Sequence, residues 1–259
     1  AAITGKEERE SEEPLVSVEI IHGDSLIEVP NLRDTTYDVA FLDPPYGVDV
    51  EQTHRSSSAW EEMFMDDKDS AHITTRLVLE RLYPKMKENS MIFVFAAHQF
   101  STLIQSMMES VGFDVDDVPL IWYRTGPQGP TMQVRKWFSR AHETIVYGHK
   151  GLKPILHQGN NVIPCDVVTP GKKVHPTEKP IGLYLELLRR VALPGQWLVD
   201  PFGGAGTAGR AALRAGLNAT IIEIEAKYVG AARYLIHGEQ PVQEDANAVP
   251  EPGREDEAS

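Results

Sequence analysis

The stretch Tyr37–Tyr46, YDVAFLDPPY, places an acidic turn directly after a short apolar run. Residues 37–42 have the length and composition of a buried β-strand, so Asp43 falls at the carboxyl end of that strand, where open α/β sheets form their ligand crevices. Prolines lack N–H donors, which leaves the Asp43 carboxylate and the Pro44 carbonyl as acceptors for an amino group. Tyr46 can stack on the ring that bears this group. Asp43, Pro44, Pro45 and Tyr46 therefore form a candidate catalytic turn for a flat, amine-bearing base, although Asp and Pro are also common in structural turns.

A second motif follows far downstream, where the strand predicted at 196–200 runs into Pro201–Thr207, PFGGAGT, and then into a helix that ends near Ala215. Glycines let the backbone approach a ligand closely, and a helix N-terminus offers unpaired N–H groups to an anion. The next predicted strand, 218–224, brings Glu223 to a position where an acid can bind ribose hydroxyls. A nucleotide-like cofactor fits this unit, with a purely structural glycine turn as the alternative. A dinucleotide site would normally show its glycine motif early in the domain.

With His175–Pro180, HPTEKP, just before the cofactor strand, these motifs resemble the amino-group DNA methyltransferases that use S-adenosyl-L-methionine. Their order is similar to that of the circularly permuted β group, and the resemblance spans roughly residues 16–236. It implies a Rossmann-like α/β methyltransferase sheet, mostly parallel with an antiparallel strand pair. Residues 14–238 are expected to form the methyltransferase domain, between disordered acidic segments at 1–13 and 239–259.

The resemblance also implies roles for individual residues. Asp24 is expected beside the adenine of the cofactor, and Lys179 is expected to pair with its carboxylate, near His175 and Thr177. The full set of expected cofactor contacts is Asp24, Asp43, His175, Thr177, Lys179, Asp200, Pro201, Phe202, Gly203, Gly204, Gly206, Thr207, Glu223 and Ile224. Without the resemblance, Asp24 is predicted to be a helix N-cap, and the alternative for Lys179 is a surface lysine without a role.

The implied reaction is methylation of the adenine N6 amine in DNA by direct in-line transfer. Such a transfer needs alignment and acceptors for the amine hydrogens rather than a nucleophile. The target atom is buried in a duplex, so the base must be flipped out, with Tyr46 replacing the lost stacking. Asp rather than Ser before Pro-Pro-Tyr favours adenine over cytosine N4. Cytosine N4 methylation and a non-catalytic nucleic-acid-binding subunit remain alternatives, a protein or small-molecule methyltransferase is a weaker one, and RNA is a further possible substrate.

The formal net charge of −13 is unusual for a DNA-binding protein, but it is unevenly distributed. Both ends of the chain are acidic, whereas residues 119–177 carry eight Lys or Arg residues against Glu143 and Asp166. Aromatic residues are interleaved with these cations, a mixture that pairs with phosphates and stacks on bases. We therefore expect a DNA-contact region at about 124–174, with a solvated loop as the alternative. The candidate nucleic-acid contacts are Arg124, Arg135, Lys136, Trp137 and Arg140.

Further features bound the function. In the family that the chain resembles, site-specific members have a larger recognition region than the short, glycine-rich segment 148–174. The resemblance therefore implies low sequence specificity, or a recognition partner or homodimer. Polar residues 47–69 are expected to form a lid, with Gly47, Asp49, Arg55 and Trp60 as substrate contacts.

Cys165 is the only cysteine and is predicted to be an ordinary buried residue, so neither cytosine C5 chemistry nor a metal site is expected. No apolar stretch is long enough to span a bilayer, and a cytoplasmic protein is expected.

The remaining elements are read from periodicity. Strands are expected at 15–21, 90–97, 118–124 and 143–149, the last two as an antiparallel pair, and a short helix is expected after Asp24. Helices are expected at 70–87, 99–111 and 181–191. The first has Ile73, Leu77, Val78, Leu82 and Met86 at helical spacing, and the last has Leu183, Leu187, Leu188 and Val191 on one face.

Overall fold

The computed structural model describes residues 16–45, 68–125, 138, 140–169, 173–175 and 177–239. Several predictions fall outside these residues: the stacking residue Tyr46, the lid at 47–67, the acidic segments at 1–13 and 240–259, and the DNA contacts Arg135, Lys136 and Trp137. They remain predictions.

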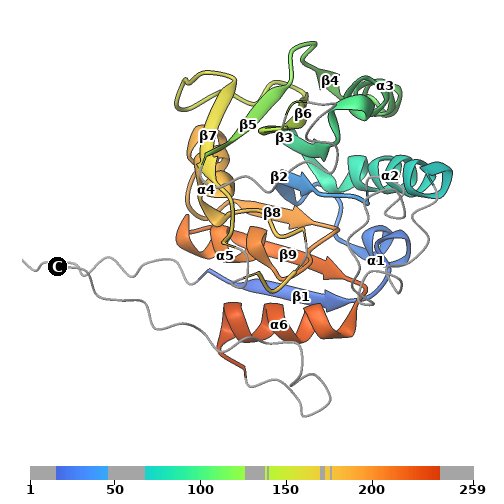
Figure 1. Ribbon diagram of the computed structural model, residues 1–259. Coiled ribbons are helices and arrows are strands. Elements are labelled where there is room, and N and C mark those ends of the chain that lie inside the picture. The colour runs from blue at the N-terminus through green and yellow to red at the C-terminus, as the bar shows by residue number, and fades with distance from the viewer. Residues whose placement is uncertain are drawn as a thin grey trace, which may run out of the picture.

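The described residues build one nine-stranded sheet (Figure 1). Its order is β1 (Val18–His22), β9 (Asn218–Glu223), β8 (Trp197–Asp200), β2 (Tyr37–Leu42), β3 (Met86–Ala96), β6 (His142–Lys150), β5 (Leu120–Thr125) and β7 (Val162–Asp166), while β4 (Asp114–Val115) pairs with β6. Strands β1 to β3 in this order are parallel, and β6 runs antiparallel to both β3 and β5. The predicted Rossmann-like sheet with an antiparallel strand pair is confirmed.

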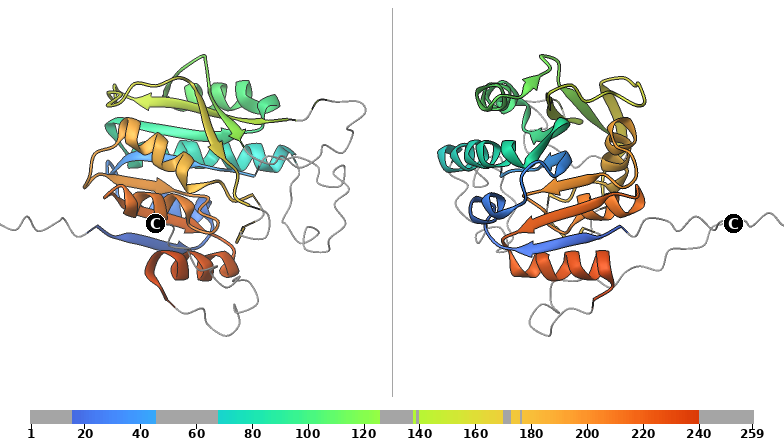
Figure 2. Two further views of the ribbon diagram at one scale, coloured as in Figure 1. Left: turned by 60° about the vertical axis from the view of Figure 1, so that its left-hand side comes forward. Right: turned by 180° about the vertical axis from the view of Figure 1, so that it is seen from behind.

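Helices cover both faces of the sheet (Figure 2). One face packs against α1 (Ser25–Asn31), α2 (Lys68–Leu82) and α3 (Ser101–Val111). The other packs against α4 (Ile181–Val191) and α5 (Thr207–Arg214), and α6 (Ala226–His237) lies against β1 and α5. Short 3₁₀ turns, η2 (Tyr83–Lys85) and η3 (His98–Phe100), follow α2 and precede α3.

Strand β2 lies at the centre of the sheet and is buried along its whole length. Its side chains alternate between the two faces: Phe41 packs toward α4, whereas Leu42 packs toward α2 and α3. The Phe41 ring stacks on Phe93, with 5.3 Å between centroids, and meets Tyr184 edge-on at 4.8 Å. Burial of this kind contributes roughly 1.5–3 kcal/mol for each large apolar side chain. The strand that carries Asp43 is therefore firmly held.

The structure differs from the predicted elements in two places. The helix expected at 70–87 ends at Leu82, because Pro84 cannot continue the hydrogen-bond ladder, and Met86 already belongs to β3. Ile73, one of the apolar residues at helical spacing, is 58% exposed. Strand β7 was not predicted at all, since Pro164 lies within it, but only β5 pairs with it among the described residues, so a missing N–H is tolerated there.

Helix α2 offers a direct test of which face is buried. Leu79→Ala should lower the free energy of unfolding by about 2–5 kcal/mol, because Leu79 is fully buried. Ile73→Ala should change it by no more than about 0.5 kcal/mol, as is usual for an exposed site. Urea unfolding of both variants measures the difference, and equal losses would contradict the packing of α2 described here.

Candidate active site

The carboxyl ends of the parallel strands meet at one edge of the sheet. Asp43 follows β2, Asp200 ends β8 and Glu223 ends β9. Asp24 follows β1, two residues after its last residue His22. Parallel pairing in this register brings together residues that are far apart in the sequence. The edge is where open α/β sheets bind ligands, so the predicted site residues converge at the expected place.

Asp43 lies against Lys179. The Lys179 ammonium donates to both carboxylate oxygens of Asp43, at 2.9 and 2.7 Å, and lies 3.6 Å from Oε2 of Glu143. Burial acts to lower the pKa of Lys179, but the Asp43 and Glu143 carboxylates outweigh it and raise that pKa. Only 5% of the Lys179 side chain is exposed. The alternative of a surface lysine without a partner is therefore wrong, and the predicted contact of Lys179 with the cofactor carboxylate remains a prediction.

The glycine turn joins β8 to α5. Asp200 accepts a hydrogen bond from the Phe202 N–H at 2.9 Å, which starts the turn. Gly206 has φ of 78°, and a Cβ there would lie 2.8 Å from Ile236 Cδ1, while a Cβ on Gly203 would lie 2.2 Å from Ile221 Cγ2. Only glycine fits both positions. No described side chain caps α5, so its first N–H groups are available to an anion.

Glu223 ties this turn to β9. Its Oε2 accepts from the Gly204 N–H and its Oε1 from the Glu225 N–H, each at 2.7 Å. Burial raises the pKa of Glu223, and these backbone donors partly oppose the rise. Each carboxylate oxygen has a second lone pair, so Glu223 can still accept from a hydroxyl group. The neighbouring Ile224 is 58% exposed, which leaves an apolar surface beside the acid.

Asp24 caps α1. Its side chain accepts from the Leu26 N–H at 2.8 Å, so the N-cap interpretation is confirmed. The next residue, Ser25, donates from its hydroxyl to the Pro201 carbonyl. This bond connects the start of α1 to the glycine turn. A contact of Asp24 with the adenine of the cofactor remains a prediction.

The segment that contains His175 lies over the glycine turn. The His175 ring meets Tyr228 edge-on at 4.3 Å, and a Cβ on Gly204 would lie 3.6 Å from that ring. Burial lowers the pKa of His175 to about 4, so the ring is neutral at pH 7. Its Nδ1 accepts from the Thr177 N–H at 3.3 Å, which places the ring proton on Nε2. His175 therefore has one N–H donor beside the turn.

Comparison with known proteins decides the family. The model of the DNA methylase family, the N6/N4 methyltransferases, matches residues 37–233. The chain belongs to this family. Its sequence is 27% identical to the type II methyltransferase M.HinfI of Haemophilus influenzae, over 87% of this chain and 70% of that protein. It is 26% identical to the type II methyltransferase M2.DpnII of Streptococcus pneumoniae, over 85% of this chain and 90% of the relative.

Solved structures share the fold of this DNA methylase. The M1.HpyAVI–SAM complex aligns with a TM-score of 0.63 and 22% identity, over 84% of this chain and 99% of that one. The cytosine-N4-specific PvuII DNA methyltransferase aligns with a TM-score of 0.66 and 18% identity, over 84% of this chain and 86% of that one. The predicted resemblance to amino-group DNA methyltransferases is thus confirmed, and so is S-adenosyl-L-methionine as the methyl donor.

The residues at the sheet edge fit this cofactor. Glu223 offers carboxylate oxygens to ribose hydroxyls, and the N-terminus of α5 offers N–H groups to a carboxylate. Gly203 and Gly206 keep the turn free of side chains. Pro201, Phe202, Gly204 and Thr207 belong to the same turn and helix start, as predicted. The contacts of these residues with the cofactor remain predictions.

The predicted DNA-contact region of the methylase divides into two parts. Arg124 donates to the Arg140 carbonyl near Asp43, and Arg140 itself is exposed. Tyr123 is 46% exposed and Phe138 is 98% exposed, so both offer rings to solvent. This part suits the prediction.

The other part of the basic stretch serves structure. The Lys150 ammonium donates to the carbonyls of Tyr83 and Met86 at the opposite end of β6, and Lys153 is buried with its ammonium 3.1 Å from Gln196. Trp122 is also buried and donates to the Cys165 carbonyl. These three residues are therefore used inside the fold, which charge density in the sequence does not show, because it does not tell which end of a strand a residue occupies.

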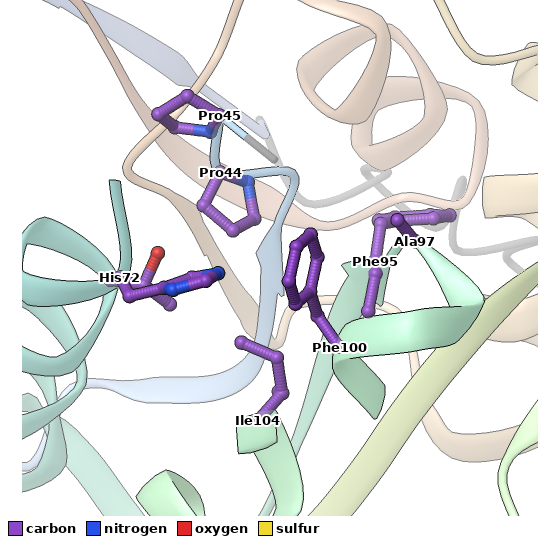
Figure 3. A pocket seen from close by; sticks show the side chains of 9 residues that line it. Pro44, Pro45, His72, Phe95, Ala97, Phe100 and Ile104 are labelled. Carbon is purple, nitrogen blue, oxygen red and sulfur yellow. The ribbon is translucent and has the colours of Figure 1, made fainter. Parts of the chain in front are cut away.

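Sequence reasoning missed the residues that support Asp43 and its turn. A small apolar pocket lies behind Pro44 and Pro45, and His72, Phe100 and Ile104 point into it (Figure 3). The His72 and Phe100 rings meet edge-on at 4.6 Å. Glu143 entered only as one of two acids in a basic stretch. Contacts between α2, η3 and the turn depend on the order of the sheet, so no local pattern could reveal them.

Asp200 should make the stability of the protein depend on pH. Burial raises its pKa from 3.8 to about 8, with Asp43 and Glu223 adding to the rise and the Phe202 N–H opposing it. Between these two pH values the folded state holds a proton that the unfolded chain has lost, so stability should fall as the pH rises through this window. Asp200→Asn retains the acceptor for Phe202 but cannot ionise.

We expect the Asp200→Asn variant to lose less stability than the wild type when the pH rises from 5 to 8. Urea unfolding midpoints at several pH values within this window measure the effect. Parallel curves for the two proteins would mean that Asp200 is already ionised at pH 5.

Proposed function

We propose that this DNA methylase transfers a methyl group from S-adenosyl-L-methionine to the N6 amine of adenine in DNA. The observation that carries the proposal is the position of Asp43, held by Lys179 at the end of β2 and next to the glycine turn on β8. An aspartate before Pro44-Pro45 supplies an anionic acceptor for an amine hydrogen. Cytosine N4 is the second candidate, because the PvuII enzyme with that specificity has the same fold.

The main task of the protein in this reaction is to align the amine nitrogen with the methyl group. S-Adenosyl-L-methionine supplies an electrophilic methyl group when bound. The Asp43 carboxylate and the Pro44 carbonyl accept the two amine hydrogens, which draws the nitrogen lone pair out of the aromatic ring and directs it along the line of transfer. The sulfonium would become a neutral thioether as its bond to the methyl group breaks, and the nitrogen would pass one proton to the hydrogen-bonded Asp43 carboxylate. Asp43 thus orients and activates the amine without forming a covalent bond.

A covalent mechanism through cysteine does not suit this site. Cys165 lies in β7 and is half-buried, rather than fully buried as predicted. Burial and the nearby Asp166 raise the pKa of its thiol, so little thiolate is present at neutral pH. This supports direct transfer to an exocyclic amine.

The target base must leave the helix to reach Asp43. Flipping costs a few kcal/mol, which favours single-stranded or mispaired targets when few duplex contacts compensate. We propose that Tyr46 stacks on the flipped base and that Arg124, Arg140 and the neighbouring residues 135–137 contact the backbone. The short segment 148–174 supports low specificity, or recognition with a partner or second copy. Type II methyltransferase relatives from bacteria support a cytoplasmic role in restriction–modification, and no helix of the described residues could cross a membrane.

The direct test is transfer of labelled methyl groups to duplex DNA, single-stranded DNA and RNA, with the products resolved as nucleosides. We expect label in N6-methyladenine, and Asp43→Ala should lower the rate by at least about 100-fold, as loss of an orienting group at the reacting centre does. Asp34→Asn is the matched control, because Asp34 is exposed and its ion pair with Lys85 lies outside the site. Label in N4-methylcytosine would establish the second candidate, and label in neither would refute both.

Arg140 should affect DNA affinity rather than the chemical step. Each lost phosphate contact lowers the slope of log K against log salt by about 1 and weakens binding to all sequences alike. We expect this result for Arg140→Ala, with the saturated transfer rate unchanged. Fluorescence anisotropy with labelled DNA at several salt concentrations measures the slope. An unaltered slope would place the phosphate contacts elsewhere.

A further inference from the structure

Lys179 lies between two carboxylates that come from different strands. Asp43 follows β2 and takes two hydrogen bonds from the Lys179 ammonium, whereas Glu143 belongs to β6 and approaches to 3.6 Å. Strand β3 separates these two strands in the sheet. The centroid of the Phe95 ring of β3 lies 5.3 Å from the same ammonium. A single buried cation is therefore shared across three neighbouring strands.

Glu143 has a second cationic partner. Its Oε1 lies 3.7 Å from Arg124 on β5, while its Oε2 is turned toward Lys179. Oε2 is shielded from water and has no hydrogen-bond partner among the described residues; the Lys179 ammonium lies 3.6 Å from it. A buried carboxylate oxygen of this kind is costly unless a cation lies close to it. The position of Glu143 is thus explained by Lys179 and Arg124 together.

The position of Glu143 does not serve the strand itself. Glu143 pairs with Trp122 of β5, and the next residue, Thr144, pairs with both β3 and β5, in a backbone ladder that does not need the carboxylate. Glutamine would fill the same volume and leave those bonds intact. The negative charge at this position therefore acts on the neighbouring cations.

We infer that Glu143 is a positioning residue for methyl transfer, acting on Asp43 through Lys179. This inference rests on the proposed function. Without Glu143, the Lys179 ammonium would pair with the Asp43 carboxylate alone, and the two side chains could change orientation together. Glu143 attracts the ammonium from the side of β6, which fixes its location and offsets part of its charge. Asp43 then remains oriented, with acceptor capacity left for the amine of the base.

The test is the single-turnover rate of methyl transfer by Glu143→Gln, with enzyme saturated by cofactor and DNA. We expect the rate to fall by about 10- to 100-fold, the usual effect of a small displacement at a reacting centre, with the half-saturating DNA concentration unchanged. A single-turnover rate constant reports only on folded, loaded enzyme, so a loss of stability alone does not lower it. Urea unfolding of the same variant records that loss separately.

A double-mutant cycle shows whether Glu143 acts through Lys179. In the Lys179→Gln background, Glu143→Gln should lower the remaining rate by less than about threefold, because residues in one network are not additive. Equal losses in both backgrounds would overturn the inference. The matched control is Glu186→Gln, which removes a carboxylate paired with two arginines on α4, away from the site, and should leave the rate unchanged.

The outcomes separate this inference from the proposed function. Wild-type enzyme that methylates adenine, together with Glu143→Gln of equal rate, would overturn the role of Glu143 alone. A Glu143→Gln defect confined to the half-saturating DNA concentration would also overturn it, since that result assigns Glu143 to DNA binding. Wild-type enzyme that methylates no adenine in any nucleic acid would overturn the proposed function and the inference with it.

Discussion

Burial of β2 on both faces is the constraint on which the rest of the structure depends. The strand is flanked by β8 and β3, and helices cover both of its faces, so every residue from Tyr37 to Leu42 is buried. A strand so held cannot shift its register without moving apolar side chains to the wrong face. Asp43 follows β2 directly. The packing of β2 residues that have no chemical role therefore fixes the position of Asp43 at the sheet edge.

The same arrangement makes a buried carboxylate tolerable. Asp43 is 16% exposed at its side chain, and an uncompensated charge there would be costly. Lys179 supplies the compensation from the segment before α4, and α4 is in turn fixed to the sheet by Leu183, Tyr184, Leu187 and Leu188. The cofactor turn depends on similar coupling, because Glu223 of β9 binds the backbone of Gly204. The Asp43 turn and the glycine turn are thus held by neighbouring strands of one sheet.

The sequence predicted the elements next to its motifs well. Strands β2 and β8, the glycine turn and α4 follow from local signals: apolar runs, turn residues and helical periodicity. It failed where the outcome depends on distant partners. Pro84 ended a helix that the apolar period continued, Pro164 concealed an edge strand, and Lys153 proved to be a buried structural residue. The pairing of Lys179 with Asp43 and Glu143 follows from sheet order, which no local pattern contains.

The placement of charge also bears on how this methylase meets DNA. Within the described residues, two lysines of the basic stretch 119–177 are used inside the fold: Lys150 donates to backbone carbonyls, and Lys153 is buried. Arg124 is engaged with Glu143 and with the Arg140 carbonyl. Phosphate contacts supply most of the sequence-independent affinity of DNA-binding proteins. Among the described residues, cations engaged in this way are less available to phosphates, so the fit of the flipped base beside Asp43 becomes a larger part of recognition than in a strongly basic enzyme.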